Sequence, residues 1–170
     1  MLKATRGFTL IELLVALTIA GILVLVGVPS LGSLMGEFRA QNASSQWQAD
    51  LAFARQAAAA YQTNVTICPL EAAAGCDGDW AAGYTVFIDV NSDGNLGAGD
   101  EVLQRRGAIN SNDHINPDAP TQFRFGEDGF TDDAGTLVYC PIDPENDSSR
   151  AVSVRSTGQT RQTRTGVDCA

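Results

Sequence analysis

The sequence has few of the side chains that carry out acid–base or metal chemistry. Its 170 residues include one histidine, His114, and no two cysteines in a CxxC arrangement. It contains no serine elbow and no phosphate-binding loop. We interpret His114 as a solvated residue of the loop between Asp113 and Asn116, and the acidic pairs in turn-like segments as solvated charges. The sequence therefore predicts that the protein is not an enzyme and has no small-molecule substrate.

Positive charge is also scarce. There are 11 lysines and arginines against 20 aspartates and glutamates, and the formal net charge is -9. Binding of nucleic acid or anionic lipid over a large surface needs a positive face, so this balance argues against both. Residues 150–166 are the exception, because they hold Arg150, Arg155, Arg161 and Arg164 and no acid. These arginines are either ordinary side chains of an edge hairpin or a phosphate-binding patch.

One long apolar segment lies near the start of the chain. The 19 residues from Leu10 to Val28 carry no charge except Glu12, and as a helix they span roughly 28 Å, close to the thickness of a bilayer core. A cleaved signal peptide is the other interpretation, but its apolar core is shorter and ends at a small-residue cleavage site, whereas Pro29 and more helix follow here. Basic residues precede the segment, which predicts a single-pass protein with a cytoplasmic N-terminus.

The residues around Glu12 carry a specific motif. Residues 7–12 read GFTLIE, which resembles the signature of type IV pilins and type II secretion pseudopilins. The resemblance implies that prepilin peptidase cleaves between Gly7 and Phe8, that Phe8 becomes N-methylated, and that Glu12 guides filament assembly. A buried carboxylate needs a partner, and the α-amino group of Phe8 in a neighbouring subunit would supply one. The implied partners are other pilins or pseudopilins, the peptidase and the bacterial inner membrane.

The rest of the chain predicts an α+β protein with one exported domain. We expect a leader at 1–7, a membrane and assembly helix at 8–29, its amphipathic continuation at 30–62, and a β-rich head at 63–170. The expected buried stripe of the helix is Leu31, Leu34, Met35, Phe38, Ala40, Ala43, Trp47, Leu51, Ala54, Ala58 and Tyr61, and its polar face is Gln41, Gln46, Asp50 and Gln56. Alternating runs predict antiparallel strands at 65–68, 84–90, 101–106, 122–126, 136–140 and 151–156.

This order of elements resembles the GspH/FimT-like branch of minor pilins and pseudopilins. The resemblance implies a minor structural subunit that leaves the inner membrane for a periplasmic or cell-surface filament, its head serving partner recognition. The alternative function is DNA uptake, because FimT-like pilins bind DNA through a GRxR motif on their last element. Residues 158–161 read GQTR, an imperfect match, so the candidate DNA contacts are Arg155, Arg161 and Arg164.

The four cysteines are expected to form disulfides, since the bulk of the chain is exported to an oxidising compartment. Of the three possible connectivities, we favour the sequential one, Cys68 with Cys76 and Cys140 with Cys169. The first pair would close a loop after the first strand. The second would tie the last element of the chain to the strand at 136–140.

A polar loop at residues 89–101 has two interpretations. Asp89, Asn91 and Asp93, followed by Gly94, match the first positions of a calcium-binding loop, with Asp100 at position twelve in place of the usual glutamate. The flanking segments predict strands rather than the helices of an EF-hand. We therefore favour a hairpin loop whose side chains cap their own backbone, with no cofactor, and keep calcium as the alternative.

Overall fold

The computed structural model describes residues 9–69, 75–141, 148–163, 167 and 169, except for the side chains of 26–31 and 33. One long helix, α1, runs from Leu10 to Tyr61 and continues through Pro29. The chain divides into two units, Met1–Met35 and Gly36–Ala170, and α1 contributes to both.

In the first unit, the part of α1 from Leu10 to Leu25 is apolar except for Glu12 and Thr18. Its large side chains from Leu10 to Leu25 are about half exposed or more. Within the described residues, no helix meets the length and hydropathy needed to cross a membrane. Gly7 and Phe8, the predicted cleavage and methylation residues, lie outside the described part of the chain.

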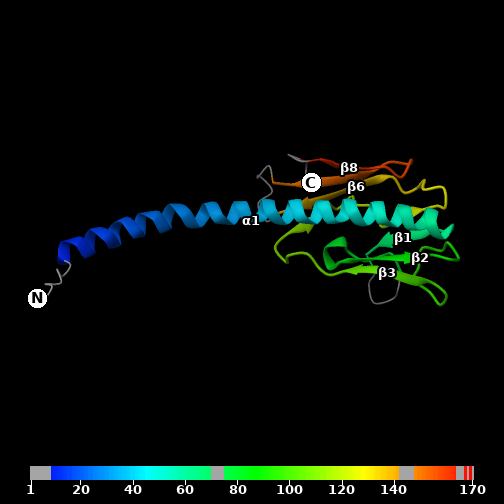
Figure 1. Ribbon diagram of the computed structural model, residues 1–170, viewed down its shortest axis with the longest axis horizontal. Helices are drawn as coiled ribbons and strands as arrows, with labels where there is room; N and C mark the ends of the chain where they lie inside the picture. Colours follow the sequence, from blue (N-terminus) through cyan, green and yellow to red (C-terminus); the bar gives the residue numbers. More distant parts are fainter. Residues whose placement is uncertain (1–8, 70–74, 142–147, 164–166, 168, 170) are drawn as a thin grey trace, which may run out of the picture. The chain divides into compact units, whose positions relative to one another are not determined.

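The second unit is a head in which the rest of α1 packs on two antiparallel sheets (Figure 1). The first sheet has the order β3-β2-β1-β5 and the second β4-β6-β7-β8. The strands of the first sheet are β1 (Val65–Cys68), β2 (Tyr84–Ile88), β3 (Glu101–Arg106) and β5 (Phe123–Phe125). Those of the second are β4 (His114–Ile115), β6 (Gly135–Cys140), β7 (Arg150–Val154) and β8 (Thr160–Thr163), and a short 3-10 helix, η1, covers Trp80–Ala82. This confirms the predicted α+β class.

One apolar core joins the helix to both sheets. Small residues on α1 allow close approach, and Trp47 and Leu51 fill the space between them and the strands. The Trp47 ring packs against Tyr139 of β6, with the ring centroids 6.0 Å apart. Trp80 of η1 belongs to the same core, with its ring centroid 5.9 Å from that of Phe123, and its indole N–H donates to the carbonyl of Pro120 at 2.6 Å.

The helix stripe differs from its prediction in two ways. Most of its members between Ala40 and Ala58 are buried, but Leu34, Met35, Phe38 and Tyr61 are exposed. Asp50, predicted on the polar face, is only 3% exposed. The polar-face prediction for Asp50 was wrong because its carboxylate is bonded to Tyr84 and Arg106 of the first sheet.

All six predicted strands are present; 65–68 and 101–106 have the predicted boundaries, and the other four shift by one or two residues. Two further strands were missed. β4 is only two residues long, and β8 reads TRQT, which has no apolar alternation. His114, predicted in a loop, lies on β4, where it pairs with Cys140 of β6.

Candidate functional site

The predicted assembly residue, Glu12, lies in the first turn of α1 and caps that helix. Thr9 precedes the first helical residue, and its backbone N–H and hydroxyl both donate to Oε2 of Glu12, each at 3.4 Å. In return, the backbone N–H of Glu12 donates to the Thr9 hydroxyl at 3.4 Å. This reciprocal arrangement is a capping box, in which a threonine and a glutamate three residues later satisfy donors that the helix leaves free. The spacing was visible in the sequence, but we interpreted Glu12 only as an assembly residue.

The capping box accounts for the lone acid in an apolar segment. Within a single chain, the carboxylate of Glu12 has local donors and lies at the positive end of the helix dipole. Around it, Leu10, Ile11 and Leu13 are all more than half exposed. The first turns of α1 therefore present a broad apolar surface with one anchored negative charge, a surface suited to packing against other apolar helices.

In the head, two clusters of arginine, aspartate and tyrosine tie α1 to the sheets. The first joins α1 to β2 and β3. The hydroxyl of Tyr84 donates to Asp50 Oδ2 at 2.7 Å, and Arg106 donates to both carboxylate oxygens, at 2.8 and 2.9 Å. The carboxylate is therefore buried but fully bonded, which offsets much of the cost of taking a charge out of water.

The second cluster joins α1 to β6 and to the loop before β4. Here the helix contributes Arg39, whose guanidinium donates to Asp113 at 2.6 and 3.0 Å. The hydroxyl of Tyr139 donates to the same carboxylate at 2.5 Å. The chemistry matches that of the first cluster, but the helix supplies the cation instead of the acid. Each sheet is thus fastened to the helix by one such cluster.

Because of Tyr84 and Tyr139, we expect the head to become less stable at alkaline pH. Burial, and then the hydrogen bond to Asp50, raises the pKa of Tyr84, and burial followed by the bond to Asp113 raises the pKa of Tyr139. The unfolded chain then loses its phenol protons first, near pH 10, so the free energy of unfolding falls as the pH rises above about 10. The slope is at most about 1.4 kcal/mol per pH unit for each tyrosine.

Chemical denaturation of the full chain in detergent at pH 9 to 11 measures this slope. A variant with both Tyr84→Phe and Tyr139→Phe is the control, because it has no phenol to ionise at these positions. An equal loss of stability in the wild type and in this variant would refute the assignment to the two tyrosines.

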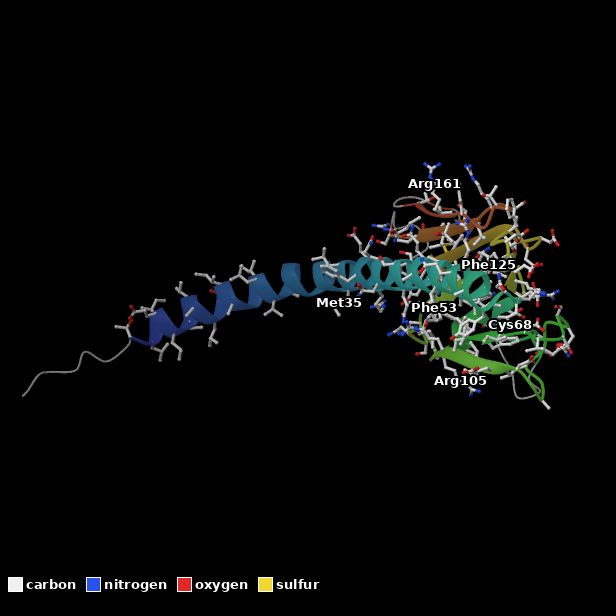
Figure 2. The ribbon with its side chains drawn as sticks, turned by 45° about the vertical axis from the view of Figure 1, so that its right-hand side comes forward. Met35, Phe53, Cys68, Arg105, Phe125 and Arg161 are labelled. Atoms are coloured by element: carbon white, nitrogen blue, oxygen red, sulfur yellow. A yellow bond between two sulfur atoms is a disulfide. The ribbon has the colours of Figure 1, made fainter. Side chains whose placement is uncertain are left out.

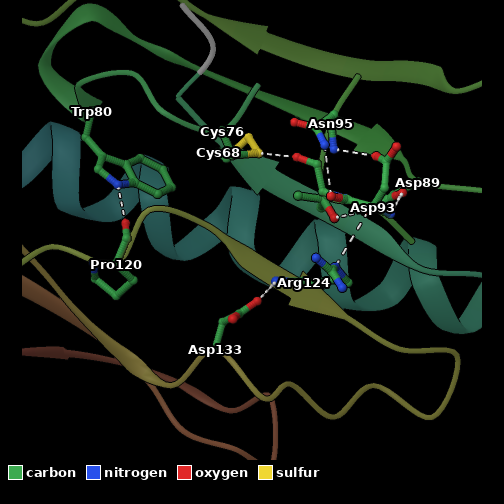
Figure 3. Close-up of a disulfide and its surroundings, with 11 residues drawn as sticks. Cys68, Cys76, Trp80, Asp89, Asp93, Asn95, Pro120, Arg124 and Asp133 are labelled. Atoms are coloured by element: carbon green, nitrogen blue, oxygen red, sulfur yellow. Dashed lines mark hydrogen bonds and ion pairs between the residues drawn. A yellow bond between two sulfur atoms is a disulfide. The ribbon is translucent and has the colours of Figure 1, made fainter. Parts of the chain in front are cut away.

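The polar loop after β2 is organised by Asp89, which is fully buried. Its Oδ2 accepts from the Thr66 hydroxyl and from the backbone N–H of Gly94, both at 3.0 Å, while Oδ1 accepts from the N–H of Asp93 at 3.1 Å. Arg124 of β5 approaches the same carboxylate, with Nε 3.6 Å from Oδ2 (Figure 3). Gly94 has a φ of +75°, the left-handed conformation that favours glycine at this turn.

The other predicted calcium ligands also accept hydrogen bonds from the loop itself. Asp93 accepts from the backbone N–H of Asn95 at 2.7 Å, and Asp100 from those of Val90 and Gly97, at 3.0 and 2.7 Å. Asn91 donates its side-chain amide to Asp93 at 2.8 Å. These are the self-capping contacts of a polar hairpin loop, the interpretation that we favoured from the sequence.

We expect that calcium does not contribute to the stability of this loop. Because the carboxylates are bonded to the backbone and Asp89 faces a guanidinium, a cation would displace existing partners. Adding calcium or a chelator should change the thermal unfolding midpoint by less than about 1 °C. A midpoint that rises with calcium concentration, and does so less in an Asp93→Asn variant, would instead establish the calcium interpretation.

The C-terminal arginines do not form a defined site in the described residues. Arg155 and Arg161 are exposed on the β7–β8 hairpin, and Figure 2 shows Arg161 directed away from the head. Arg164 lies outside the described residues. Arg150 is buried instead and bonds Glu37 of α1 at 2.9 Å. The positions of Arg155 and Arg161 agree with the interpretation of these arginines as ordinary exposed side chains of an edge hairpin.

The disulfides have the sequential pairing that we favoured from the sequence. Cys68 at the end of β1 is joined to Cys76, and Cys140 at the end of β6 is joined to Cys169. The second bond holds the C-terminal segment against β6, where Val167 packs on the same small cluster. Each bond is expected to stabilise the head by about 2 to 4 kcal/mol.

The protein combines an apolar helix, whose first turn is capped and charged, with a head of two antiparallel sheets. Together with the N-terminal methylation motif, these features place it in the pilin class of membrane-anchored filament subunits. The model of the family described as type II transport protein GspH matches residues 43–158, more than half of the chain. The model of the prokaryotic N-terminal methylation motif matches residues 2–28. The chain belongs to the GspH family, as a minor pseudopilin or minor pilin. Members of this class are structural subunits that assemble with other pilins.

Solved structures have the same fold. The type IV minor pilin FimU of Pseudomonas aeruginosa superposes with a TM-score of 0.61 over 77% of this chain and 95% of its own, at 20% identity. The minor pseudopilin EpsH from the type 2 secretion system of Vibrio cholerae gives a TM-score of 0.55 over 74% of this chain and 96% of its own, at 12% identity. No curated protein sequence matches the chain. The comparisons give no support to the DNA-binding alternative.

Proposed function

We propose that the chain is inserted once in the bacterial inner membrane through residues 8–29, is cleaved by prepilin peptidase between Gly7 and Phe8, and joins a filament through α1. The N-terminus is cytoplasmic and the head faces the periplasm before assembly. In the filament, Glu12 pairs with the N-methylated terminus of Phe8 of a neighbouring subunit. The protein acts by assembly and contact and catalyses no reaction.

The observation that carries this proposal is the carboxylate of Glu12 in the first turn of an otherwise apolar helix. A single charge in such a surface is costly unless a partner meets it. Within one chain the partner is the capping donor of Thr9. A neighbouring ammonium group would be a stronger partner, since charge-assisted hydrogen bonds are about twice as strong as neutral ones.

The head supports a role in contact rather than chemistry. His114, the only imidazole of the chain, lies beside Cys140 and Cys169, whose sulfurs are joined in a disulfide and are therefore not free thiol nucleophiles. Two of the buried carboxylates, Asp50 and Asp113, fasten the helix to the sheets, and a third, Asp89, holds the polar loop after β2. The exposed surface of the head is therefore the part that distinguishes this subunit from others in a filament.

Processing provides the first test. We expect the mature protein purified from its host to begin at N-methylated Phe8, because the Gly7–Phe8 bond occupies the cleavage point of the motif. Intact-mass and N-terminal peptide mass spectrometry measure this directly. A Gly7→Ala variant should retain the leader if the peptidase reads this glycine. A mature start near residue 30 would show that the apolar segment is a signal peptide.

A further inference from the structure

Within the head, the face of α1 that points away from the sheets carries no charge. Its residues follow one another at steps of three or four positions, so they lie on one side of the helix, and all of them are exposed. They lie opposite Trp47, Leu51 and Ala54, which belong to the core. These seven residues form the outer stripe: Phe38, Asn42, Ser45, Ala49, Phe53, Gln56 and Ala60.

The charged residues that α1 does have in the head are used elsewhere. Arg39 and Asp50 belong to the two clusters that fasten the helix to the sheets. Glu37 bonds Arg150 of β7 at 2.9 Å, and Arg55 donates to a backbone carbonyl of the loop after β5 at 3.0 Å. The exposed face of a helix in a soluble domain usually carries charged side chains. The outer stripe has none, although the chain contains 20 acids and 11 bases.

The outer stripe instead exposes two large aromatic side chains. Phe38 is 63% exposed and Phe53 is 40% exposed. Between them lie the small residues Ser45 and Ala49, which allow a second helix to approach closely, since the distance between packed helices depends on the side chains at the contact. The cores of protein–protein interfaces are rich in aromatic residues and poor in charged ones. The outer stripe therefore has the composition of a surface that is buried in an assembly.

The first unit of the same chain shows which kind of surface would match it. The large side chains from Leu10 to Leu25 are about half exposed or more, and Glu12 is the one charge among them. A subunit that leaves the bilayer for a filament takes these side chains out of lipid, so another apolar surface must cover them. The outer stripe, from Phe38 to Ala60, spans about 33 Å, long enough for the roughly 28 Å of the segment from Leu10 to Val28.

We propose that the outer stripe binds the apolar N-terminal helix of a neighbouring pilin-class subunit in the filament. This inference rests on the proposed function and names the partner of the head portion of α1. The partner's helix packs between the two phenylalanines, over Ser45 and Ala49. No charge on either surface has to be desolvated along this contact, because Glu12 lies at one end of the apolar segment.

The contact also requires a second neighbour. The centre of the outer stripe, Ala49, and the centre of the apolar segment, Ile19, are 30 positions apart, whereas pairing of Glu12 with Phe8 joins positions four apart. For parallel helices these two offsets differ by about 39 Å along the axis. One neighbour cannot satisfy both, so the subunit on the outer stripe is different from the subunit that pairs with Glu12.

Photo-crosslinking in filaments identifies the partner. The full chain is expressed in its host with p-benzoylphenylalanine at position 53, filaments are purified and irradiated, and the adduct is mapped by peptide mass spectrometry. We expect the adduct in the apolar N-terminal helix of another subunit. The same probe at position 130 is the matched control, because Phe130 is 54% exposed but lies outside the helix. It should give no adduct with that helix.

A charge placed in the outer stripe tests the same contact without a probe. Ala49→Lys should lower the amount of the protein in filaments by about tenfold or more, because a lysine would be desolvated in an apolar contact. Ala49→Ser, which adds no charge, and Ala108→Lys, at an exposed loop residue, should assemble as the wild type does. Ala49 is exposed, so the thermal unfolding midpoint of the lysine variant should stay close to that of the wild type.

The inference is wrong if the position-53 probe reacts only with the head of a neighbour, with lipid or with no partner. It is also wrong if position 130 gives the same adduct, or if Ala49→Lys enters filaments as well as Ala108→Lys does. In each of these cases the wild type is still present in filaments, so the proposed function is retained. Absence of the wild type from filaments would refute the proposed function and this inference together.

Discussion

A Glu12→Ala variant is expected to enter the membrane as well as the wild type and to be absent from filaments. The substitution removes the one charge from the apolar surface of the first helical turns. The free-energy cost of placing this segment in the membrane therefore falls. It also removes the group that would pair with the terminus of a neighbouring subunit, and the unpaired ammonium group would then be left in an apolar environment. Immunoblots of the membrane fraction and of purified filaments measure the two effects separately.

Glu12→Gln separates the two roles of this side chain. Glutamine at the third helical position still completes a capping box with Thr9, but it carries no charge. If the charge drives assembly, Glu12→Gln fails as Glu12→Ala does, whereas a role limited to capping would leave it active. Thr18→Ala is the matched control, because the Thr18 hydroxyl donates to the carbonyl of Val15 in its own helix. Normal filament incorporation of Glu12→Ala would refute the assembly role.

Asp50→Ala is expected to destabilise the head by about 3 kcal/mol, near the lower end of the range for breaking a buried ion pair. The variant leaves the buried hydroxyl of Tyr84 without its acceptor and Arg106 without its carboxylate. Arg106 is about one-third exposed and can turn toward water, which keeps the cost at this end of the range. Denaturant unfolding of the full chain, followed by the fluorescence of the two buried tryptophans, gives the free energy.

Two further variants make the result specific. Asp50→Asn keeps the volume and an acceptor for Tyr84, so it should cost less than Asp50→Ala. Asp118→Ala, at an exposed aspartate, should change the free energy of unfolding by less than about 0.5 kcal/mol. A loss at Asp50 no larger than that at Asp118 would show that the cluster does not fasten the helix to the sheet.

Local patterns predicted much of this protein. The motif at residues 7–12 indicated the class of protein, and the same threonine and glutamate specify where α1 begins, since capping is decided within four residues. Alternation of apolar and polar residues predicted six of the described strands, because side chains in a strand face opposite sides in turn. The disulfide pairing followed the order of the cysteines along the chain.

The remaining features depend on residues far apart in the sequence. Asp50 appeared polar and exposed by helical periodicity, and its burial is decided by Tyr84 and Arg106, more than 30 positions away. β4 is too short to show a period, and it exists because β6 offers it a hydrogen-bonding edge. The same pairing places His114 beside the sulfurs of Cys140 and Cys169. The sequence by itself determined the helix start, the class of protein and the six strands with apolar alternation, since these rest on neighbouring residues. Only the tertiary structure decided which charges are buried and what surrounds the histidine, because both require segments that the chain brings together on folding.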